Sequence, residues 1–280
     1  MTGVPPPIFD RALGAERSRR KQKAEPSILT RTIAEELAER LAFVNRRFER
    51  SCLIAAEPNA IAERLQEAGQ VKDIETRLPS AGDDLDLPRE RYDAVFSVLD
   101  LQSVNDVPGA LIQMRRALKP DGLLLACLFA GDTLTELRQS WLAAESVITG
   151  GASPRVSPMI DVRELGGLLQ RAGLALPVAD LDRTIVRYAD AVSLIHEIRE
   201  LGLSNTLTGR SRCFTSRMLM AAAVNHYQQN FSDADGRIRA TVDIAWLTGW
   251  APHDSQQQPL KPGSAKARLA DALRVEEKKV

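Results

Sequence analysis

The stretch from Cys52 to Gly69, CLIAAEPNAIAERLQEAG, has the outline of a strand that runs into a helix. In α/β proteins a nucleotide is commonly held at this place, by a turn rich in glycine. Here the turn carries Glu57, Pro58 and Asn59 where glycines would be expected. The stretch is therefore typical either of a binding loop that has lost its glycines or of a turn that never bound a nucleotide.

Histidine and cysteine show no spacing that indicates a site. The three histidines are His196, His226 and His253, and the three cysteines are Cys52, Cys127 and Cys213. Because these residues are scattered and no CxxC pair occurs, we expect neither a metal site nor a disulfide framework. Three unpaired cysteines favour a reducing compartment. The sequence also lacks a GxSxG elbow and a P-loop.

The overall charge gives no indication of a nucleic-acid or membrane partner. Among 280 residues, 37 basic and 37 acidic side chains cancel, so neither a nucleic-acid footprint nor an anionic membrane surface is indicated. The longest apolar run, 123–130, is far shorter than the roughly 20 residues that span a bilayer. The first residues lack the apolar core of a secretion signal. We therefore expect a soluble, cytoplasmic protein without a transmembrane segment.

Segments typical of strands and helices alternate along the chain. Apolar, strand-like runs occupy 48–56, 70–74, 94–99, 123–129 and 238–247. Helical patterns occupy 28–43, 60–68, 110–118, 191–201 and 216–227. This alternation predicts an α/β fold in which helices cover both faces of a parallel or mostly parallel sheet.

Turn and capping residues separate these elements. The segment 79–90 reads as a loop, and Lys119-Pro120-Asp121-Gly122 as a turn. Thr133 and Glu136 have the spacing of a capping box, and Asp161 with Glu164 has the same spacing before a second helix.

Ligands of such folds lie beyond the carboxyl ends of the strands. We therefore expect the functional residues in four places, which are 55–59, Asp83, 99–106 and 129–133.

Both ends of the chain differ from its middle. Residues 1–26 are rich in proline and charge, and Phe9 to Lys23 could form a basic helix. Its basic cluster is most simply a solvated face, and the alternative is a cover over an anionic ligand or acidic partner. A central domain is expected over 27–255, and the tail from 256 to 280 is polar and charged.

The run from Tyr92 to Arg138, YDAVFSVLDLQSVNDVPGALIQMRRALKPDGLLLACLFAGDTLTELR, resembles the second half of a class I S-adenosylmethionine-dependent methyltransferase. More narrowly, the chain is similar to the family of the complex I assembly factor that acts as a protein-arginine hydroxylase, and to its bacterial methyltransferase-like relatives. The stretches that match are Ile8-Phe9-Asp10-Arg11, Gly131-Asp132-Thr133-Leu134, Ser153-Pro154, Ser157-Pro158, Gly202, Ser204-Asn205 and Pro262-Gly263-Ser264-Ala265. The resemblance extends from residue 8 to about residue 270.

This resemblance implies a Rossmann-like methyltransferase fold with an inserted helical region after the fifth strand, at about 140–230, and a final antiparallel strand pair. It also implies S-adenosylmethionine as cofactor and work on a respiratory complex I subunit. The relatives would bind the cofactor through a glycine-rich first loop and through acids after the second and third strands. In this chain the acid after the second strand would be Asp73 or Glu75, and Asp83 fits the acid on the adenine side.

The first loop departs from the family pattern. The family's acid falls on Leu53, and its three glycines fall on Ala55, Glu57 and Asn59. Asn59 tolerates a positive φ better than most residues, whereas Glu57 would bring bulk and negative charge near the methionine end of the cofactor. After the fourth strand, relatives carry a His-Trp pair where this chain has Gln102 and Ser103. The expected cofactor contacts are Ala55, Glu57, Asn59, Asp83 and Leu99.

The middle of the domain is also short. Between Leu65 and Asp93 lie 27 residues, which must finish one helix and supply strand two, a helix and strand three. A single parallel crossover needs about 10–12 residues, and each strand about five or six more. We therefore expect the helix between strands two and three to be missing or vestigial.

Five residues are candidates for substrate contact, and no catalytic residue is indicated. These are Asp132, Thr133, Glu136, Arg138 and Asn205. Two readings of the function follow: an enzyme of the methyltransferase superfamily that modifies a protein side chain, or a non-catalytic assembly factor that kept the fold and lost the cofactor. A third reading is a methyltransferase that acts on a small molecule.

Overall fold

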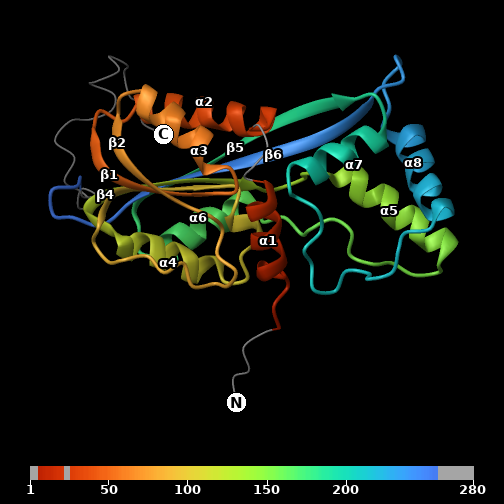
Figure 1. Ribbon diagram of the computed structural model, residues 1–280, viewed down its shortest axis with the longest axis horizontal. Helices are drawn as coiled ribbons and strands as arrows, with labels where there is room; N and C mark the ends of the chain where they lie inside the picture. The colour runs from red at the N-terminus through yellow and green to blue at the C-terminus, as the bar shows by residue number, and fades with distance from the viewer. Residues whose placement is uncertain (1–5, 22–25, 258–280) are drawn as a thin grey trace, which may run out of the picture.

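A six-stranded sheet forms the centre of the protein (Figure 1). The computed structural model describes residues 6–21 and 26–257. The strands are β1 (Phe48–Ala55), β2 (Val71–Arg77), β3 (Tyr92–Val98), β4 (Leu118–Phe129), β5 (Ala175–Tyr188) and β6 (Ile238–Trp250). Their order is β2-β1-β3-β4-β6-β5, with β2, β1, β3 and β4 parallel and β6 antiparallel to both of its neighbours. The predicted α/β fold with a mostly parallel sheet and a final antiparallel pair is confirmed.

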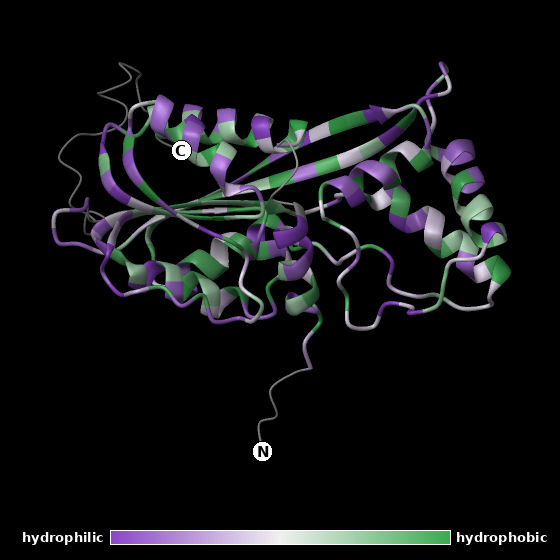
Figure 2. Ribbon diagram, viewed as in Figure 1, coloured by the Kyte–Doolittle hydropathy of each residue, from purple (hydrophilic) through white to green (hydrophobic). Residues whose placement is uncertain are grey.

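Helices cover both faces of this sheet. The helices are α1 (Arg11–Lys21), α2 (Ile28–Ala42), α3 (Pro58–Glu67), α4 (Val107–Ala117), α5 (Thr135–Ile148), α6 (Val162–Arg171), α7 (Ala191–Glu200) and α8 (Arg217–Phe231), with a short 3-10 helix at Leu101–Ser103. Helices α2 and α3 pack on one face of the sheet, and α4 and α6 pack on the other. The cause is alternation along β1, since Leu53 faces α2 and α3 while Cys52 and Ile54 face the opposite side. Figure 2 shows the result, with hydrophilic residues on the outer side of α2 and apolar residues in the strands.

The remaining helices form a separate lobe. The antiparallel pair of β5 and β6 extends beyond β4, because residues 238–243 of β6 pair with β5 and not with β4. Buried side chains of α5, α7 and α8 pack against this extension, and Tyr227 of α8 is fully buried there. We call α5, α7, α8 and this extension the helical lobe. It contains the strand β5, so the range 140–230, which the family resemblance describes as helical, is not helical throughout.

The region between β2 and β3 is shortened as expected. Residues 78–91, all of them described, form neither a helix nor a strand. The missing helix is thus confirmed, and the third strand of the family pattern is absent with it. As a result β2 is the edge strand of the sheet.

Of three local predictions, two need correction and one is confirmed. The predicted turn at 119–122 lies inside β4, where Asp121 has a φ of 62° and the register with β3 shifts. The capping box of Thr133 and Glu136 is wrong, because α5 has Leu134 at its N-cap and no side-chain cap among the described residues. The cap at Asp161 is confirmed, since its carboxylate accepts a hydrogen bond from Arg163 N.

The expected basic helix is present as α1, although residues 1–5, 22–25 and 258–280, including most of the predicted polar tail, lie outside the described part. No helix in the described ranges is both long and apolar enough to span a membrane.

Candidate functional site

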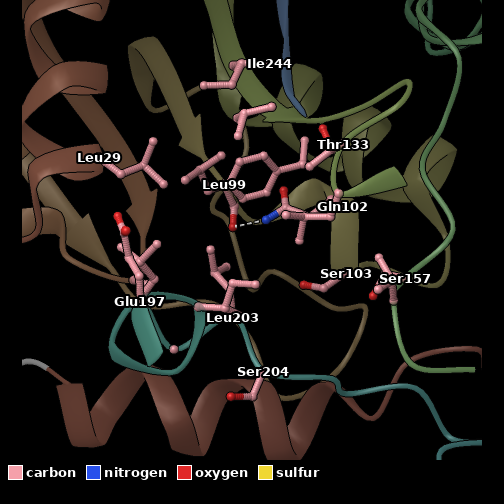
Figure 3. A pocket seen from close by; sticks show the side chains of 18 of the residues that line it. Leu29, Leu99, Gln102, Ser103, Thr133, Ser157, Glu197, Leu203, Ser204 and Ile244 are labelled. Carbon is pink, nitrogen blue, oxygen red and sulfur yellow. Dashed lines mark hydrogen bonds between the residues drawn. The ribbon is translucent and has the colours of Figure 1, made fainter. Parts of the chain in front are cut away.

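A cavity of about 420 Å³ lies at the carboxyl edge of the sheet, between the sheet and the helical lobe (Figure 3). Its walls come from the ends of β1, β3 and β4, from β5 and β6, from α1 and α2, and from α7 with the loop that follows it. Its volume falls in the range of small-molecule sites, roughly 300–1,000 Å³. The cavity is thus where the fold class predicts a ligand.

Helix α1 covers one side of the cavity. Arg11 Nη1 lies 2.7 Å from Asp100 Oδ1, and the two side chains are 5% and 1% exposed. Arg11 Nη1 also donates to Ser103 Oγ at 3.2 Å. Farther along the helix, Arg17 Nη1 donates to the backbone carbonyls of Ser204 (2.6 Å) and Asn205 (3.1 Å). The helix therefore connects the loop after β3 to the loop after α7.

The turn after β1 does not have the shape of a glycine loop. None of residues 55–59, all of them described, has a positive φ. Glu57 is the N-cap residue of α3, with φ −124° and ψ 67°, and Pro58 begins the helix. Ala56 reaches the cavity, whereas Ala55 is buried in the core and Asn59 is exposed on α3.

The Glu57 carboxylate is directed at α2. Its Oε2 accepts hydrogen bonds from Ser27 N (3.3 Å), Ser27 Oγ (3.2 Å) and Thr30 Oγ1. These groups lie at the N-terminus of α2, where free N–H groups and the helix dipole favour an anion. The negative charge that we expected beside the cofactor is therefore used to stabilise α2, and Glu57 does not line the cavity.

The acids expected near the ribose and adenine are held elsewhere. Glu75 lies within β2, and its Oε1 accepts hydrogen bonds from Arg77 at 3.1 and 2.8 Å, while Arg91 lies 3.5 Å from its Oε2. Asp83 Oδ1 accepts from Asn105 N at 3.1 Å, which links the 78–91 loop to the loop after β3. Neither carboxylate lines the cavity.

Comparison with known proteins agrees with this architecture. A family model described as a methyltransferase domain matches residues 34–126. Arginine-hydroxylase NDUFAF5, mitochondrial, of Rattus norvegicus is 35% identical to the chain over 295 residues, covering 96% of this chain and 84% of that protein. The chain belongs to the NDUFAF5 family. The Homo sapiens member is 34% identical over 285 residues, covering 92% of this chain and 81% of that protein.

A solved structure supports the fold of this NDUFAF5 relative. A protein from Bacillus halodurans, described as a candidate methyltransferase, superposes with a TM-score of 0.52 and 11% identity, covering 78% of this chain and 100% of that one. At this identity the likeness shows the methyltransferase fold alone.

S-adenosylmethionine does not fit the residues present in the way that the fold would bind it. The first loop has side chains and ordinary φ angles where the family resemblance implies glycines, and Leu53, at the position of the family's acid, is fully buried among apolar side chains. Of the acids expected at the ribose and adenine, Glu75 is bonded to Arg77 and Arg91 and Asp83 to Asn105, while Asp73 is exposed on β2 and does not line the cavity. The chain therefore lacks the groups by which this fold ordinarily holds the cofactor.

The loop after β4, in contrast, is held by hydrogen bonds to a buried carboxylate. Asp243 of β6 is fully buried, and its carboxylate accepts hydrogen bonds from Asp132 N (2.8 Å) and from Arg183 Nε and Nη2 (2.7 and 2.6 Å). Gly131 has a φ of 55°, and a Cβ there would lie 2.5 Å from Asp243 Oδ2. Burial acts to raise the pKa of Asp243, but the bonds from Arg183 and Asp132 outweigh it and hold that pKa below its ordinary value.

The substrate candidates on this loop and at the start of α5 already make hydrogen bonds or ion pairs within the protein. Asp132 pairs with Arg183 at 2.6 Å, and Glu136 is buried, accepting hydrogen bonds from Thr241 N and Oγ1. Thr133 Oγ1 donates to the carbonyl of Ala130 at 2.8 Å. Of these candidates, Thr133 lines the cavity, while Asp132 and Glu136 do not.

The two remaining substrate candidates differ in whether they reach the cavity. Arg138 Nη2 donates to Ser157 O at 3.0 Å and does not line the cavity, whereas Asn205 lines it and donates from Nδ2 to Pro154 O at 2.7 Å. Leu99, among the expected cofactor contacts, lines the cavity with a φ of 50°.

Sequence reasoning missed the charged residues that α2 and β5 bring to the site. Glu36 and Asp182 line the cavity and both accept hydrogen bonds from Arg40, at 3.1 and 2.6 Å. The guanidinium carbon of Arg40 lies 4.4 Å from the centre of the Trp246 ring. Burial is the main reason that the pKa of Glu36 is raised. No local pattern in the sequence signals this group, because its members lie on α2, β5 and β6.

Among the described residues no group of three or more His, Cys, Asp or Glu is placed to hold a metal ion.

Proposed function

We propose that this NDUFAF5 relative engages a protein, a subunit of respiratory complex I, to modify it or to assist its assembly, and that it does so without holding S-adenosylmethionine in the usual first loop. The observation that supports this best is the position of Glu57, whose carboxylate is bonded to Ser27 and Thr30 of α2. The loop is thus part of the scaffold. The protein partner is suggested by the family resemblance and by the activity after which the relatives are named, arginine hydroxylation.

The cavity supports a role in binding as well as in structure. It combines apolar walls with the Glu36 and Asp182 carboxylates, which already bind the guanidinium of Arg40. Those carboxylates are already paired with Arg40, so other polar groups of the lining are left to contact a partner. We propose Thr133 and Asn205, which line the same cavity, as contacts to that partner.

Isothermal titration with S-adenosylmethionine tests the cofactor part of the proposal. We expect no saturable heat at ligand concentrations up to about 1 mM, and micromolar binding would contradict us. The triple variant Ala55→Gly, Glu57→Gly, Asn59→Gly shows whether the loop alone is responsible. We expect it to remain without binding, because the acids near the ribose and adenine positions stay bonded elsewhere.

The partner is tested by complementation. In a deletion strain, the wild-type chain should restore complex I activity, and the Thr133→Val and Asn205→Ala variants should restore less of it than the Gln139→Ala control. Gln139 is exposed on α5 and does not line the cavity. Full complementation by an empty vector would exclude this role. We also propose a cytoplasmic location, although the curated relatives are mitochondrial.

Methyl transfer is the second candidate function. The match of the methyltransferase-domain model to residues 34–126 favours it. Methyl transfer requires a bound methyl donor. The titration with S-adenosylmethionine therefore decides between methyl transfer and a role without this cofactor.

A further inference from the structure

The cavity at the carboxyl edge of the sheet is lined by more acidic than basic side chains. In the described part of the chain, its charged residues are Asp10, Arg11, Glu36, Asp100, Arg155, Asp182 and Glu197. A ligand must be compatible with the charges that remain after these residues have paired within the protein.

Both guanidinium groups of the lining are paired. Arg11 lies 2.7 Å from Asp100, and Arg155 Nε lies 2.7 Å from Glu145 Oε1. Since each already has a carboxylate partner, an anionic ligand would enter the cavity without a counter-charge.

Three carboxylates of the lining are paired with arginines that do not line the cavity. Glu36 and Asp182 lie 3.1 and 2.6 Å from Nη2 of Arg40. Asp10 Oδ2 lies 3.2 Å from Arg210 Nη2. Because one guanidinium group serves both Glu36 and Asp182, these pairs leave an excess of negative charge.

Glu197 of α7 is the remaining carboxylate of the lining. It forms no ion pair with any residue in the described ranges. Burial is the main cause that raises the pKa of Tyr188, and interaction with the Glu197 carboxylate is the second. The Tyr188 hydroxyl also lines the cavity and stays neutral near pH 7, so it leaves the charge of Glu197 without compensation.

Apolar side chains make up much of the wall around this carboxylate. Figure 3 shows Glu197, Leu29 of α2 and Leu203 of the loop after α7 around the same space. Leu99 and Ile244 reach it from the strands. One uncompensated carboxylate among apolar walls favours a ligand that has a cationic end group on an aliphatic stem.

We infer that Glu197 holds the cationic end group, an ammonium or a guanidinium, of an aliphatic chain that enters this cavity. This role rests on the proposed function, since the aliphatic chain is a side chain of the protein partner that the cavity contacts. Glu197 is then the residue that selects the partner's side chain by its charge.

A matched series of six-carbon ligands tests the inference on the full-length wild-type protein. Near pH 7, hexan-1-amine is a cation, hexan-1-ol is neutral and hexanoate is an anion, while their aliphatic stems are nearly the same. Titration should show that hexan-1-amine binds about ten-fold more tightly than hexan-1-ol, because hydrogen bonds between charged groups are stronger than neutral ones. Hexanoate should bind more weakly than either, since its charge finds no partner in the cavity.

Substitutions on α7 assign the effect to one residue. Glu197→Gln should lower the affinity for hexan-1-amine about ten-fold, to that of hexan-1-ol, and should leave the affinity for hexan-1-ol nearly unchanged. Glu200→Gln is the matched control, because Glu200 is exposed on the same helix and does not line the cavity. Glu197→Lys should reverse the preference, so that hexanoate binds more tightly than hexan-1-amine. A purely structural role of Glu197 would not produce this reversal.

Three outcomes would overturn the inference: absence of hexan-1-amine binding, equal binding of hexan-1-amine and hexan-1-ol, or an unchanged affinity for hexan-1-amine in Glu197→Gln. The first two are measured on the wild-type chain, so a variant that fails to fold cannot hide them.

Complementation tests whether the partner supplies the cation. In the deletion strain, Glu197→Gln should restore less complex I activity than Glu200→Gln, and equal restoration would overturn the assignment to the partner's side chain. Failure of the wild-type chain to restore activity would contradict the proposed function instead, and the ligand series would still decide whether Glu197 binds a cation.

Discussion

Arg11 at the start of α1 and Asp100 after β3 form a buried ion pair at 2.7 Å, and through it the N-terminal segment is attached to the edge of the sheet. The pair is supported by Ser103 and by the carbonyl of Gly82, which accepts from Arg11 Nε at 3.5 Å. Both side chains are almost fully removed from water, so each depends on the other for its counter-charge.

Loss of this pair should release α1. Arg11→Ala leaves the Asp100 carboxylate buried without its counter-charge, a change that costs about 3–5 kcal/mol in comparable cases. We expect faster amide hydrogen exchange across residues 11–18 and a lower urea midpoint. Arg20→Ala is the control, because Arg20 pairs with Glu16 on an exposed face. Equal exchange in both variants would show that the pair does not hold the helix.

Glu57 should act as a stabiliser of α2. Glu57→Ala removes the acceptor at Ser27 and Thr30 and should lower the free energy of unfolding by about 0.5–2 kcal/mol, as the loss of a helix cap does. Glu63→Ala, an exposed position on α3, should change it far less. Urea unfolding measures the free energy of unfolding of both variants. An unchanged free energy in Glu57→Ala would refute the capping role.

Asp243 should determine the conformation of the loop after β4. In Asp243→Ala, Asp132 N and the Arg183 guanidinium lose their acceptor, and we expect a loss of about 1–3 kcal/mol. Asp235→Ala breaks an exposed pair with Arg187 and should cost at most about 1 kcal/mol. The comparison is made by thermal and urea unfolding. Similar losses in the two variants would contradict the special role of Asp243.

Stability should fall in acid for a defined reason. Burial opposes ionisation of Asp243 and Glu145, but their hydrogen bonds outweigh it, so the pKa of each lies below its ordinary value of 3.8 or 4.5. A lowered pKa contributes stability above the unfolded-state pKa, and that contribution is lost as the pH falls through the folded-state pKa. The urea midpoint should therefore be nearly flat from about pH 7 to pH 5 and decline below about pH 4. The urea midpoint of Asp243→Asn should decline less steeply with falling pH than that of the wild type. An identical slope in the two proteins would contradict this explanation.

Thiol reactivity should differ sharply among the three cysteines. Burial raises the pKa of Cys52 to about 11 and that of Cys127 to about 12, whereas Cys213 is exposed. Since the thiolate is the reactive form, alkylation of the native protein near pH 8 should modify Cys213 and spare the other two. Mass spectrometry of the peptides measures this. Rapid labelling of Cys127 would mean that the sheet opens at β4.

Much of the fold follows from local sequence patterns. Apolar runs such as 94–99 and 123–129 lie within the buried strands β3 and β4, and the helix predicted at 28–43 is α2. The exception is β5, which was not located. Its side chains are exposed or half-buried on both faces, so it lacks the alternation that marks a strand.

The sequence by itself determined most of the strands and helices, though not β5. It also determined the absence of glycines in the first loop and the shortness of the segment before Tyr92, because these depend on residue types and counts along the chain. Only the tertiary structure decided the direction of the Glu57 carboxylate, the pairing of Asp243 with a loop 111 residues away, and the partner that Glu136 finds in Thr241. The physical reason is that a buried carboxylate takes the donors that packing places beside it. Those donors come from other elements of the fold, so no pattern in its own segment identifies them.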